Sequence, residues 1–355
     1  MNQIELLKEK IAQAALGLPP VTIMEVCGTH THAIRRHGIR QLLPANILLV
    51  SGPGCPVCVT AEEDIALALA LAKTPNVTLF CFGDMMRVPS GDESLLSLRS
   101  GGADVRIAIS PMDALDFALA NPTREVVWYG VGFETTTPHT AALLEQASAL
   151  GVTNLCVYSA HKTMPNALVA LLGGETHVDA LLCPGHVSAM IGAEAFRFVP
   201  KTLHLPAAVA GFEPEELLIA ILALVQMLKS GKPNLVNAYP RVVHSEGNAA
   251  AQALVDAWFT PCDAVWRGLG EIPQSGLALR PEHASWDAVK RFSPQIEPPK
   301  KRSACRCGDV LRGSIEPPEC PLFGKICLPE HPLGACMVSS EGACAAYYQY
   351  EGAGL

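Results

Sequence analysis

Short apolar runs that alternate with helix-compatible stretches limit most strongly how this chain can fold. Eight such runs precede residue 212, and most of their residues are apolar without a period-two alternation. Strands of this kind are buried on both faces, which is typical of parallel sheets covered by helices. The runs lie at residues 21–26, 47–50, 77–82, 105–109, 125–131, 154–159, 180–183 and 207–211. Stretches with helical spacing include residues 61–73, 112–120, 137–149 and 213–229.

The number of runs exceeds the needs of one compact sheet, so we expect two doubly wound α/β domains with parallel sheets. The natural first boundary is Asn121-Pro122-Thr123, which gives a first domain of residues 1–122. The second domain would span residues 123–299 and end in a Pro-rich linker that starts at Arg280. Residues 300–355 are short and dense in cysteine, and they predict a small third domain.

Composition and charge exclude several classes of protein. The net charge is −8, whereas a nucleic-acid-binding face would be basic. The longest apolar run, residues 217–228, has about 12 residues, and a membrane span needs roughly 20. The chain starts with polar residues and gives no sign of a secretory leader, so we expect a cytoplasmic protein. In that compartment its 13 cysteines indicate metal or redox chemistry rather than structural disulfides.

Six cysteines crowd the last part of the chain. A segment this short cannot build much core, so thiolate ligation would help to hold it together. Zinc sites usually contain paired C-x-x-C knuckles, which are absent here, whereas iron–sulfur clusters accept four thiolates at wider spacing. We therefore favour a cluster, with zinc or metal-free thiols as alternatives, and two thiols could form a redox pair. The six are Cys305, Cys307, Cys320, Cys327, Cys336 and Cys344.

Cys27 follows the first apolar run and precedes a helix-compatible stretch. A thiol at a helix start meets unpaired backbone N–H groups, which we expect to lower its pKa. His30 or His32 could share a metal or a proton with it, and a thiolate with an imidazole suits iron, copper or zinc. The alternative is a buried structural cysteine beside solvent-exposed histidines.

Cys55 and Cys58 form a C-x-x-C after a Ser-Gly-Pro-Gly loop, again between a strand and a helix. Such a pair typically cycles between dithiol and disulfide, and two structural thiols are the alternative. Because consecutive parallel strands are usually neighbours, we expect this pair and Cys27 at the same sheet edge.

Four further strand ends carry polar residues. The turn from Gly132 to Pro138 contains Glu134 and threonines that could cap a helix and hold an anion, or form only a plain capped turn. Asp84, His186 and Glu213 follow other runs, and together these positions predict one cleft at the carboxyl ends of the strands. The remaining cysteines we expect in the core: Cys81, Cys156, Cys183 and Cys262.

Five motifs together resemble the HypD family of [NiFe]-hydrogenase maturation factors, over residues 20 to 350 or so. They are Cys27-Gly-Thr-His-Thr-His, Ser-Gly-Pro-Gly-Cys55-Pro-Val-Cys58, Gly-Phe-Glu134-Thr-Thr, Pro-Gly-His186-Val and Glu341-Gly-Ala-Cys344-Ala-Ala-Tyr-Tyr. The resemblance implies two α/β domains and a C-terminal [4Fe–4S] domain. It also implies a scaffold that, with a small HypC-like chaperone, holds iron while the Fe(CN)₂CO group is built. Cyanide would come from a HypE–HypF complex, and the hydrogenase large subunit would be served indirectly.

The resemblance also implies roles for individual residues. Cys27 would bind the iron with help from His30, Cys55 and Cys58 would be the redox pair, and Glu134 and His186 would belong to the catalytic cleft. The cluster ligands would be Cys307, Cys320, Cys327 and Cys344. Cys305 and Cys336 would remain as a pair like that of ferredoxin–thioredoxin reductase. An assembly scaffold is thus expected rather than a turnover enzyme, and the alternative is a thiol–disulfide oxidoreductase with an iron–sulfur cluster.

Overall fold

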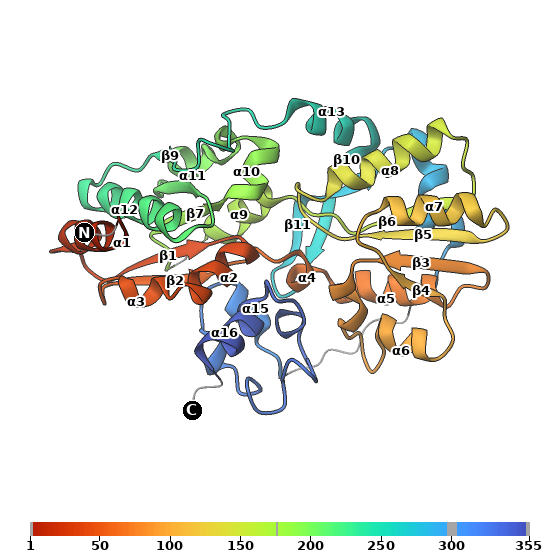
Figure 1. The fold of residues 1–355 in the computed structure, drawn as a ribbon, viewed down its shortest axis with the longest axis horizontal. Coiled ribbons are helices and arrows are strands. Elements are labelled where there is room, and N and C mark those ends of the chain that lie inside the picture. Colours follow the sequence, from red (N-terminus) through yellow and green to blue (C-terminus); the bar gives the residue numbers. More distant parts are fainter. Residues whose placement is uncertain (1–2, 175–176, 297–303, 353–355) are drawn as a thin grey trace.

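Two parallel sheets stand side by side in the computed structural model, which describes residues 3–174, 177–296 and 304–352 (Figure 1). All eight apolar runs form strands, and the predicted α/β class is confirmed. One sheet has the order β2-β1-β7-β8-β9, and the other has the order β4-β3-β5-β6. The strands are β1 (Val21–Glu25), β2 (Ile47–Ser51), β3 (Val77–Cys81), β4 (Val105–Ile107), β5 (Glu125–Gly130), β6 (Leu155–Ser159), β7 (Ala180–Pro184), β8 (Ala207–Ala210) and β9 (Leu235–Asn237).

The sheets do not follow the order of the chain. The five-stranded sheet takes β1 and β2 from the start of the chain and β7 to β9 from its middle, because β1 pairs with β7. The four-stranded sheet is inserted between these two parts. In it β3 pairs with β5, so the boundary expected at residue 122 falls inside one sheet.

Helices cover both faces of the five-stranded sheet. The longest, α12, starts with Pro214 in its first turn and ends at Gly231, whose φ of 64° is left-handed. It packs on α1, and together with α2 they enclose an apolar core against β1, β7 and β8. The helices of this part are α1 (Gln3–Ala15), α2 (Gly28–Arg36), α3 (Ile39–Leu42), α10 (Gly185–Ile191), α11 (Phe198–Thr202) and α12 (Pro214–Ser230), with the 3₁₀-helix η2 (Ala193–Phe196).

The four-stranded sheet is covered in the same way, and Trp128 lies in its fully buried core. The four helical stretches named from the sequence are all present, as α5, α7, α8 and α12. The helices around this sheet are α5 (Glu62–Ala72), α6 (Leu95–Ser100), α7 (Met112–Ala120), α8 (Thr137–Ala149) and α13 (Ala249–Trp258), with η1 (Gly83–Arg87). The helix α9 (Met164–Leu172) lies beside β7 in Figure 1.

An antiparallel hairpin between the two sheets was not expected. Its strands are β10 (Phe259–Trp266) and β11 (Gly270–Leu279). Exposed and less exposed residues alternate along β10, and for that reason Cys262 is half-buried rather than a core residue. The other three expected core cysteines, Cys81, Cys156 and Cys183, are fully buried. The expected linker begins as helices, η3 (Pro281–Trp286) and α14 (Ala288–Phe292), and its last residues, 297–299, lie outside the described chain.

The cysteine-rich segment packs below α2 and α4 in the view of Figure 1. There α16 contacts α2, and η5 contacts α4. One continuous buried cluster joins the four-stranded sheet, α4 and this segment. The elements are α4 (Pro56–Val59), α15 (Cys307–Leu311), η4 (Pro317–Glu319), η5 (Ala335–Met337) and α16 (Ala343–Glu351).

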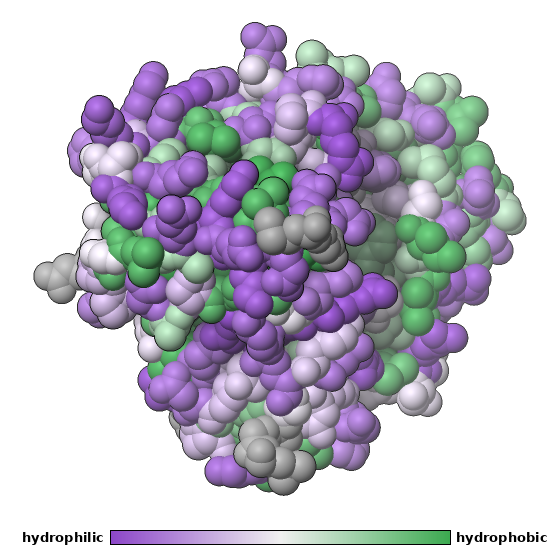
Figure 2. All heavy atoms as spheres, turned by 60° about the vertical axis from the view of Figure 1, so that its left-hand side comes forward, coloured by the Kyte–Doolittle hydropathy of each residue, from purple (hydrophilic) through white to green (hydrophobic). Residues whose placement is uncertain are grey.

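The surface on the side of α1 is a mixture of hydrophilic and hydrophobic residues, with purple groups interrupting the green ones (Figure 2). Among the described residues, none of the helices has both the length and the apolar character that a bilayer span requires.

Candidate functional site

Cys27 lies where β1 ends and α2 begins, and the loop before Cys55 packs directly against it. The N–H of Gly28 donates to the carbonyl of Gly54 at 2.9 Å. A Cβ atom at Gly54 would overlap the backbone of Cys27, so only glycine allows this approach. The strands β1 and β2 pair in parallel. The prediction that both thiol motifs meet at one sheet edge is therefore confirmed.

The thiol of Cys27 is buried, and its acidity differs from the expectation. Burial raises the pKa of Cys27 to about 12, with a further contribution from the carboxylates of Glu341 and Glu25. The backbone N–H groups of His30 and Thr29 act in the opposite direction, as a helix start should. Burial outweighs them, so the expectation of a lowered pKa is wrong. The thiol therefore keeps its proton at pH 7.

His30 is fully buried behind Cys27. Its Nε2 lies 3.0 Å from the carbonyl oxygen of Gly211 and 3.3 Å from that of Ala210. Carbonyls only accept, so Nε2 carries the proton and Nδ1 keeps a free lone pair. No described residue pairs with Nδ1, and burial lowers the pKa of His30 to about 4. His30 is therefore neutral at pH 7, in the form that binds metals. His32 instead bonds to the hydroxyl of Tyr350 at 2.8 Å.

His186 joins this region through an aromatic contact. Its ring stacks on Phe212 with centroids 4.0 Å apart, and Phe212 lies 4.9 Å from the ring of His30. Phe212 follows β8 and His186 follows β7, so two neighbouring strand ends converge on the Cys27 turn. The burial of His186 lowers its pKa. The structure thus brings Cys27, His30 and His186 together.

The C-terminal motif closes the site from the other side. The hydroxyl of Thr29 donates to Glu341 at 2.8 Å, and a Cβ atom at Gly28 would overlap the Glu341 side chain. The hydroxyl of Ser339 donates to Asp84 at 2.7 Å. Asp84 therefore reaches this region through the cysteine-rich segment. Burial raises the pKa of Glu341, and the neighbouring Asp84 adds to the effect.

Glu134 lies elsewhere. Its Oε1 accepts the N–H of Met164 at 2.8 Å, and Oε2 has no partner among the described residues. It lines a separate pocket at the start of α8 and α9, which contains neither Cys27 nor His186. Burial raises the pKa of Glu134 to about 7. The expectation that all strand-end residues share a single cleft is not met, because Glu134 belongs to the four-stranded sheet.

The sulfur atoms of Cys55 and Cys58 lie at disulfide-bonding distance, with their Cα atoms 5.2 Å apart. Both residues are at most 3% exposed. The sulfur of Cys58 is 3.9 Å from the carbonyl oxygen of Ala335, the residue before Cys336. The pair therefore faces Cys27 on one side and the cysteine-rich segment on the other.

The six C-terminal cysteines surround one small cavity, and all are free thiols. Cys307 lies in the middle, with thiol hydrogen bonds to Cys305 and to Cys336. Cys327 accepts the N–H of Leu333 at 3.4 Å. The thiols fill most of the space between them and leave about 10 Å³. Among the described residues, no group of three or more His, Cys, Asp or Glu side chains is arranged around a single metal ion.

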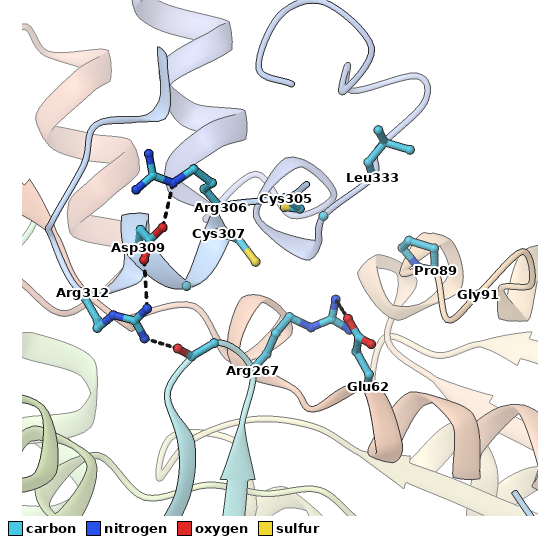
Figure 3. A pocket seen from close by; sticks show the side chains of 13 residues that line it. Glu62, Pro89, Gly91, Arg267, Cys305, Arg306, Cys307, Asp309, Arg312 and Leu333 are labelled. Atoms are coloured by element: carbon cyan, nitrogen blue, oxygen red, sulfur yellow. Dashed lines mark hydrogen bonds and ion pairs between the residues drawn. The ribbon is translucent and has the colours of Figure 1, made fainter. Parts of the chain in front are cut away.

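Arg267, at the tip of the hairpin, was not expected, and it lines a neighbouring pocket that shares Cys305 and Cys307 with this cavity. Its N–H donates to the carbonyl of Val59, and its Nε donates to that of Thr60, both at 2.9 Å. Nη1 lies 3.7 Å from Glu62, while Nη2 has no partner among the described residues. Figure 3 shows the guanidinium facing the same space as the sulfur of Cys307, in a pocket of about 380 Å³.

A sequence signal for this hairpin does exist. Residues 266–270, Trp-Arg-Gly-Leu-Gly, place two glycines in a short stretch, which is typical of a hairpin turn. An arginine in such a turn is normally exposed. Its burial depends on what packs against the turn, and the local sequence does not contain that information.

Comparison with known proteins gives consistent matches. The family model described as "HypD: Hydrogenase formation hypA family" matches residues 2–351. The "Hydrogenase maturation factor HypD" of Escherichia coli (strain K12) is 46% identical over 353 residues, 99% of this chain and 95% of that protein. A protein of the same name from Rhizobium leguminosarum bv. viciae is 46% identical over 336 residues, 92% of this chain and 87% of that protein. The "Hydrogenase expression/formation protein HupD" of Azotobacter chroococcum mcd 1 is 44% identical over 352 residues, 97% of this chain and 93% of that protein. By the extent of these matches, the chain belongs to the HypD family.

Proposed function

We propose that this protein is a hydrogenase maturation factor that acts as an assembly scaffold rather than as a turnover enzyme. The names of its relatives support the general role. In detail, we propose that it holds iron with a HypC-like chaperone while the Fe(CN)₂CO group is built. Cyanide would arrive from a HypE–HypF complex, and the finished group would pass on toward the hydrogenase large subunit.

The iron of this proposal is cargo, and Cys27 and His30 are its proposed ligands. The free Nδ1 lone pair of His30 supports this, because a neutral imidazole fixed by a hydrogen bond at its other nitrogen is a prepared metal ligand. Cys27 would supply a thiolate once iron displaces its proton. His186 would hold the ring of Phe212 against His30 and so fix the orientation of the imidazole.

A [4Fe–4S] cluster is the proposed resident cofactor, held by Cys307, Cys320, Cys327 and Cys344. Six free thiols around one cavity fit such a donor set, and so does an apolar shell that contains Leu322 and Phe323. A bound cluster would supply and accept single electrons.

Cys55 and Cys58 are the proposed electron store. A dithiol that becomes a disulfide gives up two electrons and two protons. Two electrons convert a thiocyanate, R–S–CN, into a thiolate, R–S⁻, and cyanide, which balances the step. The position of the pair supports this role, because Gly54 touches the Cys27 backbone and Cys58 approaches the segment that carries Cys336.

A free-standing thiol–disulfide oxidoreductase is the weaker alternative. Such an enzyme needs an attacking sulfur that a substrate disulfide can reach. Cys55 and Cys58 are 3% and 0% exposed. Their burial favours electron transfer within the molecule.

One observation carries the proposal most of all: the turn at Cys27 bonds to the C-x-x-C loop, and the C-x-x-C pair shares one continuous buried cluster with most of the C-terminal cysteines. The test is anaerobic purification with the partner chaperone, followed by infrared spectroscopy of bound cyanide and carbon monoxide. Cys55→Ser and Cys58→Ser should keep iron and partner binding but stall cyanide transfer. If both variants mature hydrogenase normally, and alkylation mapping never finds Cys55 linked to Cys58, the redox role is refuted.

A further inference from the structure

A second large pocket lies away from the thiol sites, between elements that belong to both sheets. Its walls come from the starts of α8 and α9, from α10 and α13, and from the hairpin. Its volume of about 570 Å³ falls within the range of small-molecule sites, about 300–1,000 Å³. Apolar side chains form much of the wall, among them Met190, Ile191, Val255 and Leu277. The pocket can therefore accept an apolar group.

Glu134 is the one buried acid in this wall. Met164 satisfies its Oε1, whereas Oε2 has no donor among the described residues. Glu134 is 8% exposed, so water does not replace the missing donor easily. A buried acceptor without a donor is destabilising. A ligand that donates a hydrogen bond here would remove that penalty.

Two amide side chains of the pocket donate to backbone carbonyls. Nδ2 of Asn166 donates to the carbonyl of Gln274 at 2.7 Å. Nε2 of Gln252 donates to the carbonyls of Met190 at 2.9 Å and Glu246 at 2.7 Å. Gln252 has then used both of its N–H groups and keeps its oxygen for a ligand, whereas Asn166 has used one of its two. The acceptors that the pocket offers to a ligand are its amide oxygens and its carboxylates.

The charged residues that line the pocket also favour a ligand that donates hydrogen bonds. Asp256, exposed on α13, adds a second carboxylate to the lining. None of the described residues that line the pocket is Lys, Arg or His. We propose that this pocket binds an organic cation, an ammonium or guanidinium group on a short apolar stem, with Glu134 as its buried counter-charge. Burial raises the pKa of Glu134 to about 7, and a bound cation would favour the ionised form.

This proposal goes beyond hydrogenase maturation and does not depend on iron or on a cluster. The same chemistry belongs to free amines and to the Lys or Arg side chain of another protein. The experiment therefore has two arms. One uses butylammonium and butylguanidinium, with 1-butanol as the uncharged control. The other uses a short peptide that has a single central arginine, with a citrulline peptide as its control.

Binding is measured by calorimetry on the full chain. We expect at least one cation to bind at least tenfold more tightly than its uncharged control. Glu134→Gln should weaken that binding at least tenfold, and it keeps an oxygen that can accept from Met164. Asp256→Asn, at an exposed position, should weaken binding less. Ala251→Leu should block the pocket. Glu63→Gln, an exposed carboxylate change outside the pocket, should leave the affinity unchanged.

Binding of a small cation without binding of the arginine peptide identifies a free small molecule as the ligand. Binding of the peptide alone identifies the side chain of a partner protein. Equal binding of cation and uncharged control overturns the proposal, and so does binding that Glu134→Gln and Asp256→Asn both leave unchanged. If Glu134→Gln fails to fold, Asp256→Asn and Ala251→Leu decide the question together. A protein that matures hydrogenase yet binds no cation refutes this inference alone.

Discussion

Six buried side chains keep a polar atom that no described residue pairs, among them Tyr129, His161 and Ser188. The other three belong to the sites described above: His30 through Nδ1, Glu134 through Oε2 and Arg267 through Nη2. Each such atom lowers the stability of the fold unless something binds it. These three stand at different places: next to the Cys27 turn, in the pocket at the starts of α8 and α9, and beside Cys305 and Cys307. At the scale of single residues, these atoms mark the points where we expect a ligand or a charge to be received.

Cys27→Ala should abolish iron loading at the first site and leave the C-terminal cluster intact. Water does not replace a thiolate ligand with similar softness, so the loss should be near-total. Iron content and the infrared cyanide bands of the complex measure the effect. Cys183→Ala, which removes another fully buried thiol, is the matched control and should load normally. Cyanide bands at normal yield in Cys27→Ala would refute the assignment.

His161 should make stability depend on pH. Burial lowers its pKa from 6.5 to about 4, so the unfolded chain takes up a proton first as pH falls. Its contribution to stability is therefore lost between pH 6.5 and 4, by on the order of 3 kcal/mol. Burial raises the pKa of Glu134, which gives an opposite pH dependence in both the wild type and His161→Gln. Comparing these two proteins cancels that contribution and isolates the effect of the histidine. In urea unfolding at pH 7 and 4.5, His161→Gln should lose less stability on acidification than the wild type. His37→Gln, a change at an exposed histidine, is the control and should lose as much stability as the wild type. If His161→Gln also loses as much as the wild type, the prediction is contradicted.

At the scale of elements, turns rather than strands position the chemistry. The loop after β2 touches the start of α2, and the hairpin tip touches the end of α4 and the start of α15. Gly268 lies so close to Gly308 that a Cβ atom on either would overlap the other backbone. These contacts join segments that are distant in the sequence, and they set the relative positions of the thiols.

Gly54→Ala should disturb both thiol motifs at once. The new Cβ atom would meet the backbone of Cys27, which cannot rotate away as a flexible side chain would. We expect a loss of about 1–3 kcal/mol in the free energy of unfolding, together with weaker iron binding. Gly83→Ala is the control, because its Cβ atom would meet only Ile107 at 3.6 Å. If Gly54→Ala and Gly83→Ala are equally stable, the loop before Cys55 moves to accept the new Cβ atom and the prediction is wrong.

Arg267→Gln should lower the reduction potential of the proposed cluster. A buried cation stabilises the reduced, more negative form, and its removal should change the equilibrium about tenfold, or ~59 mV for one electron. Glu62→Gln removes the opposing charge and should raise the potential. Arg267→Lys should behave nearly like the wild type. Arg291→Gln, which breaks an ion pair with Glu125 in the four-stranded sheet, is the control. If the wild type and Arg267→Gln both bind the cluster and have the same reduction potential, the proposed effect of Arg267 on the potential is rejected.

At the scale of the whole molecule, the cysteine-rich segment packs beneath the junction of the two α/β parts. Arg35 on α2 pairs with Glu351 on α16, and Arg87 on η1 donates to the carbonyls of Pro329 and Val338. The segment thus contacts elements associated with both sheets. Its stability and the geometry of the Cys27 site should depend on each other.

Serine variants of Cys307, Cys320, Cys327 and Cys344 should each lose iron and sulfide and destabilise the C-terminal segment. Cys305→Ser and Cys336→Ser should keep the visible absorbance near 400 nm, because their thiols are not proposed ligands. Iron and sulfide analysis with thermal unfolding measures both effects. Full colour in any of the first four variants would refute the ligand assignment.

The sequence by itself determined the eight strands of the apolar runs, the four named helices and the adjacency of Cys27 to the C-x-x-C loop. Continuous apolar runs and consecutive parallel strands are local signals, and they needed no distant partner. Tertiary structure decided which strands share a sheet, because β1 and its partner β7 are separated in the sequence by all four strands of the other sheet. It also decided that the Cys27 thiol holds its proton and that Glu134 and Arg267 are buried. Burial depends on segments far apart in the chain, and it outweighed the helix-start effect that the local sequence predicts.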